Sequence, residues 1–157
     1  MSPAKQFCTF FVEDLFFGIE VLKVQDVIRH QEMTRVPLAP DTIVGLINLR
    51  GQIVTVIDLR ARLELPRRRT HEPVMNAIVL SDEGGVSLLV DKIGDVVDGP
   101  DDLYAPPPEA ISGIARELIK GVYKMENNLL LILDPEKTVD LLAVGNHEKR
   151  RDHPAPV

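Results

Sequence analysis

Two strings in the chain each have a weakly similar counterpart further along, and this repeat constrains the fold more than any other feature. KVQDVI at Lys23–Ile28 resembles KIGDVV at Lys92–Val97. GLINLRGQIVTVID at Gly45–Asp58 likewise resembles GVYKMENNLLLILD at Gly121–Asp134, and these two strings have the same length. Because both pairs occur in the same order, the repeat indicates a chain built from two related structural units.

The apolar runs are short, rich in β-branched residues and bounded by Gly, Asn, Asp or Pro, which is typical of strands. The predicted strands are Phe7–Val12, Leu15–Ile19, Val27–Val36, Leu46–Leu49, Ile53–Ile57, Ala77–Leu80, Val86–Val90, Val96–Val97, Leu118–Lys124 and Leu129–Leu133. Residues that tolerate tight turns predict hairpins at Glu13-Asp14, Arg50-Gly51, Asp82–Gly85 and Glu126–Asn128. We therefore predict an all-β fold of two small barrels packed together, because closing each sheet covers its strand edges.

Helical signals are few. One short helix is predicted near the end, where Asp134 can cap it and Pro135 suits its first position. A second short helix is predicted at Val21–Asp26. The last residues lose apolar periodicity, so we expect one domain over residues 6–144 and a flexible C-terminal tail at 145–157.

Composition narrows the class of protein. The 157 residues are 45% hydrophobic with five Phe, two Tyr and no Trp, which predicts an aliphatic core. A net charge of -6 disfavours nucleic acid and anionic lipid as partners. The longest apolar run, Leu129–Leu133, is far shorter than the roughly 20 residues of a membrane-spanning helix, and the N-terminus has no signal-peptide pattern. We expect a cytoplasmic protein without membrane insertion.

No arrangement of residues typical of a catalytic or metal site is apparent. The histidines lie at no metal-ligand spacing from one another: His30, His71, His147 and His153. Asp91, Asp95 and Asp98 fall in a strand and turn pattern, which favours a turn or solvated edge over a divalent-ion site. The single cysteine, Cys8, lies in an apolar strand pattern and is expected to be structural. We therefore expect no enzyme activity, metal or cofactor.

Three basic features leave alternatives open. Arg67–Arg69 fits a contact with an acidic partner or, as we favour, a solvated loop between the repeat units; the same choice applies to Lys149–Arg151. Arg50 lies at a predicted hairpin tip, where an arginine is well placed for bidentate recognition of a carboxylate. A simple polar turn residue explains Arg50 equally well.

Pro40–Leu59 contains an Asn-Leu-Arg-Gly hairpin followed by an apolar strand ending in Asp-Leu. With this segment as the strongest match, the chain resembles the CheW-type chemotaxis coupling proteins over Gln6–Leu142. The resemblance implies two five-stranded, SH3-like barrels on a shared apolar interface. It also implies a non-catalytic adaptor, without a cofactor, that couples the cytoplasmic tips of chemoreceptors to the regulatory domain of a CheA-type histidine kinase.

The resemblance further implies a partner-binding surface. Its positions here are Val24, Asp26, Val27, Ile93 and Val96 toward the receptor, and Arg50 with Gly45 and Asn48 as supports at the junction of receptor and kinase. The apolar pattern alone favours ordinary core for the Val and Ile positions. Two residues depart from the family pattern, because Asp26 stands where Glu is common and Ser87 where some relatives have Gly.

A second class of function stays open from the residues alone. A small β-barrel of the SH3 or OB type can also bind nucleic acid. The acidic charge and the seven aromatic residues argue against this alternative, because such binding uses basic grooves and stacking rings.

Overall fold

The computed structural model describes residues 5–29, 31–66, 73–82 and 84–140. The predicted tail at 145–157, both basic clusters (Arg67–Arg69 and Lys149–Arg151) and the four histidines lie outside these ranges. Residues 67–72 lie in the chain between two strands, β5 (Gln52–Asp58) and β6 (Met75–Ser81). These two strands belong to one sheet. The solvated loop predicted at Arg67–Arg69 stays a prediction, because these residues lie outside the described ranges.

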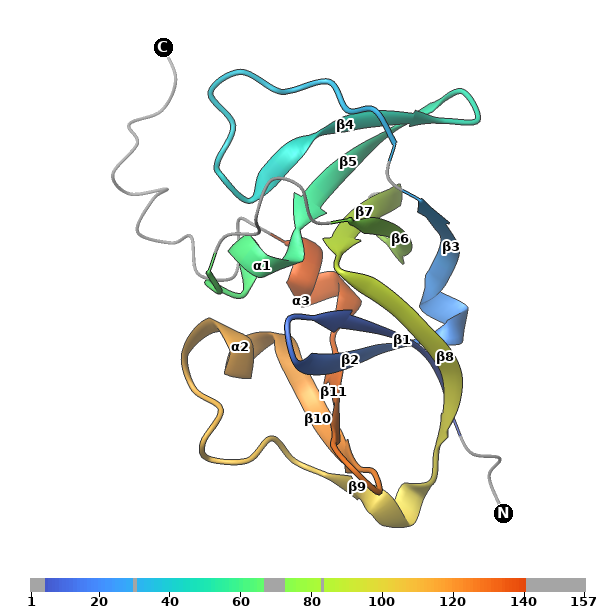
Figure 1. The fold of residues 1–157 in the computed structure, drawn as a ribbon, viewed down its shortest axis with the longest axis vertical. Coiled ribbons are helices and arrows are strands. Elements are labelled where there is room, and N and C mark those ends of the chain that lie inside the picture. The colour runs from blue at the N-terminus through green and yellow to red at the C-terminus, as the bar shows by residue number, and fades with distance from the viewer. Residues whose placement is uncertain (1–4, 30, 67–72, 83, 141–157) are drawn as a thin grey trace.

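The described chain is mostly strand, with three short α-helices and two 3-10 turns (Figure 1). The other strands are β1 (Lys5–Val12), β2 (Leu15–Glu20), β3 (Val24–Arg29), β4 (Ile43–Leu49), β7 (Gly84–Val90), β8 (Lys92–Gly99), β9 (Tyr104–Ala105), β10 (Ile119–Lys124) and β11 (Leu129–Leu133). The helical elements are η1 (Val21–Lys23), α1 (Leu59–Arg62), η2 (Asp101–Leu103), α2 (Gly113–Leu118) and α3 (Pro135–Val139).

The strands form two sheets. Sheet A has the order β8-β1-β2-β11-β10-β9, and sheet B has the order β3-β6-β7-β5-β4. Neighbours are antiparallel except β11 with β2 and β5 with β7, which are parallel. The expected all-β fold of two SH3-like barrel subdomains is confirmed, with two α-helices, α1 and α2, that were not predicted and with β9 as a sixth strand of sheet A.

The repeated strings occupy equivalent places in the two sheets. In the β4–β5 hairpin Gly45 lies opposite Val56, and in the β10–β11 hairpin the matching Gly121 lies opposite Ile132. Each hairpin also shifts register just before that glycine. The shorter strings form the edge strands β3 and β8. The repeat therefore marks strands that hold equivalent positions in the two sheets.

The two units are not consecutive halves of the chain. Sheet B consists of the single segment from β3 to β7, whereas sheet A combines the N-terminal β1–β2 hairpin with β8 to β11 (Figure 1). The β1–β2 hairpin is the counterpart of β6–β7, because each lies in the same position of its sheet order. The chain must therefore cross from one sheet to the other twice.

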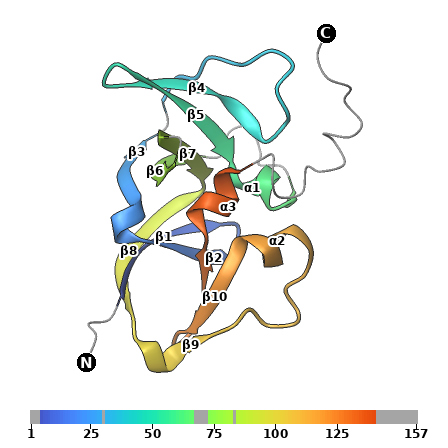
Figure 2. The ribbon, with the colours of Figure 1, turned by 180° about the vertical axis from the view of Figure 1, so that it is seen from behind.

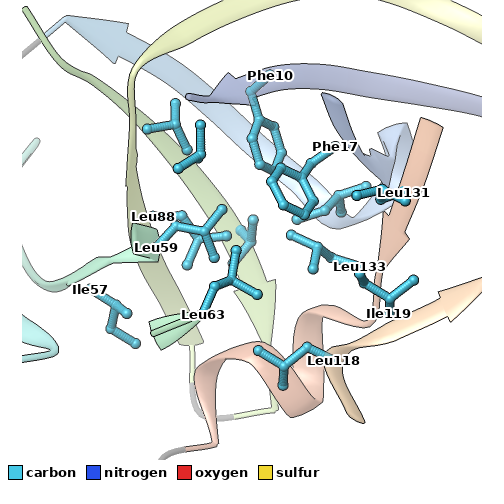
Figure 3. Packing of buried hydrophobic residues seen from close by; sticks show 14 of the residues in the cluster. Phe10, Phe17, Ile57, Leu59, Leu63, Leu88, Leu118, Ile119, Leu131 and Leu133 are labelled. Atoms are coloured by element: carbon cyan, nitrogen blue, oxygen red, sulfur yellow. The ribbon is translucent and has the colours of Figure 1, made fainter. Parts of the chain in front are cut away.

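One hydrophobic core is shared by both sheets (Figure 3). Its buried residues are Phe10, Val12, Phe17, Ile19, Ile57, Leu59, Leu63, Val79, Leu88, Val90, Leu118, Ile119, Val122, Leu131 and Leu133. Side chains alternate between the two faces of a strand. On β11, Leu131 and Leu133 therefore join the shared core, while Leu130 and Ile132 join a smaller core that belongs to sheet A. Sheet B has its own small core around Ile78.

Three predicted boundaries were wrong. The helix predicted at Val21–Asp26 is only the 3-10 turn η1, because β3 begins at Val24 and its β-branched residues pair with β6. The strand predicted at Val27–Val36 ends at Arg29, and beyond it Thr34 forms an isolated bridge to Leu46. The strand predicted at Val96–Val97 is the eight-residue β8, whose Gly and Asp residues have low strand propensity.

Candidate functional site

Arg50 lies at the tip of the β4–β5 hairpin, as predicted. Arg50 and Gly51 both have positive φ, 53° and 85°, which is the geometry of a type I′ turn. The side-chain oxygen of Asn48 accepts a hydrogen bond of 3.0 Å from the backbone N–H of Gly51. Asn48 thus supports the turn that presents Arg50, although a left-handed conformation is unfavourable for arginine.

An ion pair joins this hairpin to the opposite edge of sheet B. Arg50 Nη2 lies 2.8 Å from Asp26 Oδ2 on β3, while the other carboxylate oxygen of Asp26 accepts from the backbone N–H of Val27. Because β3 and β4 are the two edges of sheet B, this pair helps to bring the edges together. The Arg50 side chain is 71% exposed and that of Asp26 25%. Such an exposed pair contributes about 1 kcal/mol or less, so a partner can replace it at little cost.

Sheet A cannot form the same pair. The repeat places Asp95 at the position of Asp26, and Glu126 at the position of Arg50. Both residues are acidic, so they cannot form a pair of opposite charges. The Thr9 hydroxyl instead donates a hydrogen bond to the backbone carbonyl of Asp95. The hairpin arginine and its acidic partner are therefore specific to sheet B.

The predicted Val and Ile positions lie on the two edge strands, which run along the same side of the molecule in both views (Figures 1 and 2). Val24 and Ile93 occupy matching positions and pack, partly buried, against the shared core. Val27 is half-buried, and its counterpart Val96 is 56% exposed. We call Val24, Asp26 and Val27 of β3, Ile93 and Val96 of β8, and Arg50 the edge-strand surface.

Gly45 is a supporting residue. It is buried on β4, and a Cβ atom built on it would lie 2.6 Å from the backbone oxygen of Thr34. This close approach allows Thr34 to exchange two backbone hydrogen bonds with Leu46, of 2.9 and 2.8 Å. Gly45 therefore supports the base of the hairpin and is not accessible to a partner.

Replacing Gly45 with alanine is expected to lower the free energy of unfolding by about 1–3 kcal/mol, because the added methyl group meets backbone rather than a movable side chain. Thermal denaturation followed by circular dichroism measures this change. An unchanged midpoint would show that residues 33–35 are not held against β4.

A buried charged cluster around Arg60 of α1 was not predicted from the sequence. Arg60 Nε and Nη2 lie 3.2 and 2.7 Å from the two carboxylate oxygens of Asp91, and Nη1 lies 3.2 Å from Glu13 Oε1. The Arg60 side chain is 8% exposed and that of Asp91 17%. The expected turn role of Asp91 is correct, but Asp91 is an ion-pair partner rather than a solvated residue.

A second buried arginine of the same helix contacts α3. Arg62 donates hydrogen bonds to the backbone carbonyls of Thr138, Lys137 and Asp140, at 2.8, 2.9 and 3.2 Å. These carbonyls lie at the C-terminal end of α3, where the last backbone carbonyls have no hydrogen-bond donor within the helix and a cation interacts favourably with them. Burial lowers the pKa of Arg62, while the nearby Asp140 opposes this effect. Arg62 therefore joins the two helices that follow the repeated hairpins.

Other possible chemical sites lie away from the edge-strand surface. A cavity of about 300 Å³ in sheet A is lined by Lys5, Phe7, Glu20, Asp101, Tyr104, Lys120, Tyr123 and Ile132. Glu20 there pairs with Lys5 at 3.4 Å and with Lys120 at 4.0 Å. Burial raises the pKa of the Cys8 thiol, which keeps it protonated at neutral pH. Within the described ranges, no three His, Cys, Asp or Glu residues gather as metal ligands.

Two interlocked barrels whose edge strands present apolar side chains beside a hairpin arginine define an interaction scaffold. The CheW-like domain family matches residues 6–143. The chemotaxis protein CheW of Bacillus subtilis is 32% identical over 140 residues, covering 89% of this chain and 90% of that protein. CheW of Klebsiella aerogenes is 30% identical over 136 residues, covering 87% and 82%. The chain belongs to the CheW-like domain family.

A solved structure agrees with this assignment. The crystal structure of the scaffolding protein TtCheW from Thermoanaerobacter tengcongensis superposes with a TM-score of 0.80 at 25% identity, covering 88% of this chain and 94% of that one. The chain is accordingly a non-catalytic coupling adaptor of chemotaxis signalling, as the resemblance implied. The nucleic-acid alternative is not supported. In the part of the chain that the structure describes, no helix is long and apolar enough to cross a bilayer.

Proposed function

We propose that the protein couples the cytoplasmic tip of a chemoreceptor, a methyl-accepting chemotaxis protein, to the regulatory domain of a CheA-type histidine kinase. It acts in the cytoplasm, recruited to receptor arrays at the membrane. One domain over residues 6–144 performs this role, and the family match over residues 6–143 supports these bounds. The observation that carries the proposal is the edge-strand surface, which combines a replaceable ion pair with the half-buried Val27 and the exposed Val96.

The chemistry of this surface suits the proposed partners. A receptor tip presents helices, and an apolar helix face that covers Val27 and Val96 stabilises the complex by removing apolar surface from water. Arg50 can exchange the carboxylate of Asp26 for a carboxylate of the partner, because both side chains reach solvent. Apolar contact and one fixed charge together supply affinity and orientation.

A pulldown with purified fragments tests the proposal. The receptor tip and the kinase regulatory domain are supplied separately, each at low and at moderate salt. We expect both fragments to bind at micromolar concentration. Failure of either fragment to bind under both salt conditions would refute the coupling role.

Replacing Arg50 with aspartate is expected to weaken partner binding about tenfold or more, because a charged hydrogen bond of about 1.5–3 kcal/mol is lost and a carboxylate is introduced. Titration calorimetry with each fragment measures the affinity. Arg50→Asn is the matched control for the turn, since Asn-Gly is favoured in type I′ turns and Asn adds no charge. A large fall in the melting temperature of both variants would instead assign Arg50 to structure.

A further inference from the structure

The chain crosses between the two sheets at two points, and the crossings differ in length. It passes from sheet A to sheet B through the three residues of η1, between β2 and β3. It returns through the single residue Asp91, between Val90 at the end of β7 and Lys92 at the start of β8. Both edge strands of the edge-strand surface therefore begin at a crossing.

Asp91 is bound to both sheets at once. Its carboxylate accepts two hydrogen bonds from Arg60, which lies on α1 directly after β5 of sheet B. The same carboxylate accepts a 2.7 Å hydrogen bond from the backbone N–H of Glu13, in the β1–β2 turn of sheet A. The backbone N–H of Asp91 also donates to the carbonyl of Phe11 at 3.0 Å. The short crossing is thus held by contacts from each side.

The other crossing has no comparable anchor at the matching position. The repeat aligns Lys23 with Lys92, so the residue that corresponds to Asp91 is Leu22. Leu22 is 86% exposed and, being apolar, cannot form a charged contact. β8 is consequently held to sheet B at this crossing by a partly buried ion pair, whereas Leu22 of η1 supplies no ion pair at the matching position of the other crossing.

We propose that Arg60 is a positioning residue for the edge-strand surface: by holding Asp91, it fixes β8 relative to β3 and so aligns the two halves of the surface that bind a partner. Ile93 and Val96 follow Asp91 on β8, so a rotation at Asp91 moves both side chains relative to Val27. This alignment does not depend on a bound partner. Its importance for partner binding rests on the proposed function.

The test measures the distance between the two sheets directly. Nitroxide spin labels are attached to cysteines introduced at Gln52 and Asn127, at the tips of the β4–β5 and β10–β11 hairpins, in the full chain with Cys8→Ala. These hairpins lie in different sheets and point to different ends of the molecule (Figure 1). A wider range of angles between the sheets therefore appears as a broader distance distribution in pulsed electron paramagnetic resonance.

We expect Arg60→Met to broaden the distribution at least twofold, whereas Leu130→Ala leaves its width unchanged. Leu130 is the control because it is fully buried in the core that belongs to sheet A, so its truncation destabilises the protein without touching the crossing. An unchanged width in Arg60→Met, or equal broadening in both variants, would overturn the proposal.

A second variant keeps the proposal testable if Arg60→Met does not fold. Asp91→Asn preserves the shape of the side chain but removes its charge, and it is expected to broaden the distribution as well. An unchanged width would count against the proposal.

Affinity for the receptor-tip fragment is then measured on the same samples and is expected to fall about tenfold. Broadening with unchanged affinity would overturn the link to binding. A wild-type chain that binds no fragment would refute the proposed function, and the distance result would still stand.

Discussion

Replacing Phe17 with alanine is expected to lower the free energy of unfolding by about 3–5 kcal/mol, the range for deleting a buried aromatic ring. Phe17 is 1% exposed on β2 and stacks on Phe10 with ring centroids 6.0 Å apart. Figure 3 shows both rings among the residues of the shared core. The truncation therefore removes contacts that belong to both sheets.

Because the core is shared, we expect one cooperative unfolding transition in the Phe17→Ala variant, shifted to lower urea. Hydrogen exchange of backbone amides in β6 and in β10 reports on sheets B and A separately. Phe16→Ala is the matched control, since Phe16 is only partly buried and packs against the small core of sheet A; its cost should be smaller. Independent unfolding of the two sheets would contradict a shared core.

Replacing Arg60 with methionine is expected to destabilise the protein by about 3–5 kcal/mol, because it leaves the partly buried carboxylate of Asp91 without its charged partner. Urea denaturation of Arg60→Met, Asp91→Asn and the double variant measures how far the two effects are coupled. We expect the double variant to lose clearly less than the sum of the single losses.

An exposed arginine provides the control for this result. Arg116 of α2 donates hydrogen bonds to the backbone carbonyls of Pro108 and Ile111, at 2.9 and 3.1 Å, and it forms these contacts at the surface. Arg116→Met should cost less than about 1 kcal/mol. A loss of that size for Arg60→Met as well would show that the Arg60–Asp91 pair contributes little to stability.

The repeated hairpins are the part of the fold that the sequence predicts best. Ile53–Ile57 is apolar except for Thr55, Leu129–Leu133 is apolar throughout, and each hairpin is followed or ended by an aspartate. Asp58 and Asp134 accept hydrogen bonds from the first turns of α1 and α3. Local pattern therefore determines these elements. The prediction of Pro135 at the start of a helix is confirmed for the same reason.

The interlocking of the two sheets was not predictable from the repeat. β1–β2 and β6–β7 hold equivalent places, yet aligning Phe7 with Asn76 and Phe10 with Val79 reveals no common motif. A barrel position requires only apolar residues on the appropriate face, so different sequences satisfy it. Long-range pairing decides which hairpin completes which sheet.

The candidate site was predictable in part. The hairpin position of Arg50 follows from the turn residues, whereas its pairing with Asp26 depends on sheet closure. The burial of Arg60 was not predicted, because the short stretch of mixed polar and apolar residues around it is equally typical of a solvent-exposed arginine. Its burial depends on Asp91 and Glu13, 31 and 47 residues away along the chain.

Reconstitution of kinase control tests the coupling role most directly. Autophosphorylation of a CheA-type kinase is measured with receptor-containing membranes, with and without this protein. We expect receptor-dependent kinase activity only when the protein is present, and its loss with Arg50→Asp at an unchanged melting temperature. Equal kinase activity with and without the protein, when kinase and receptor are both functional, would contradict the account.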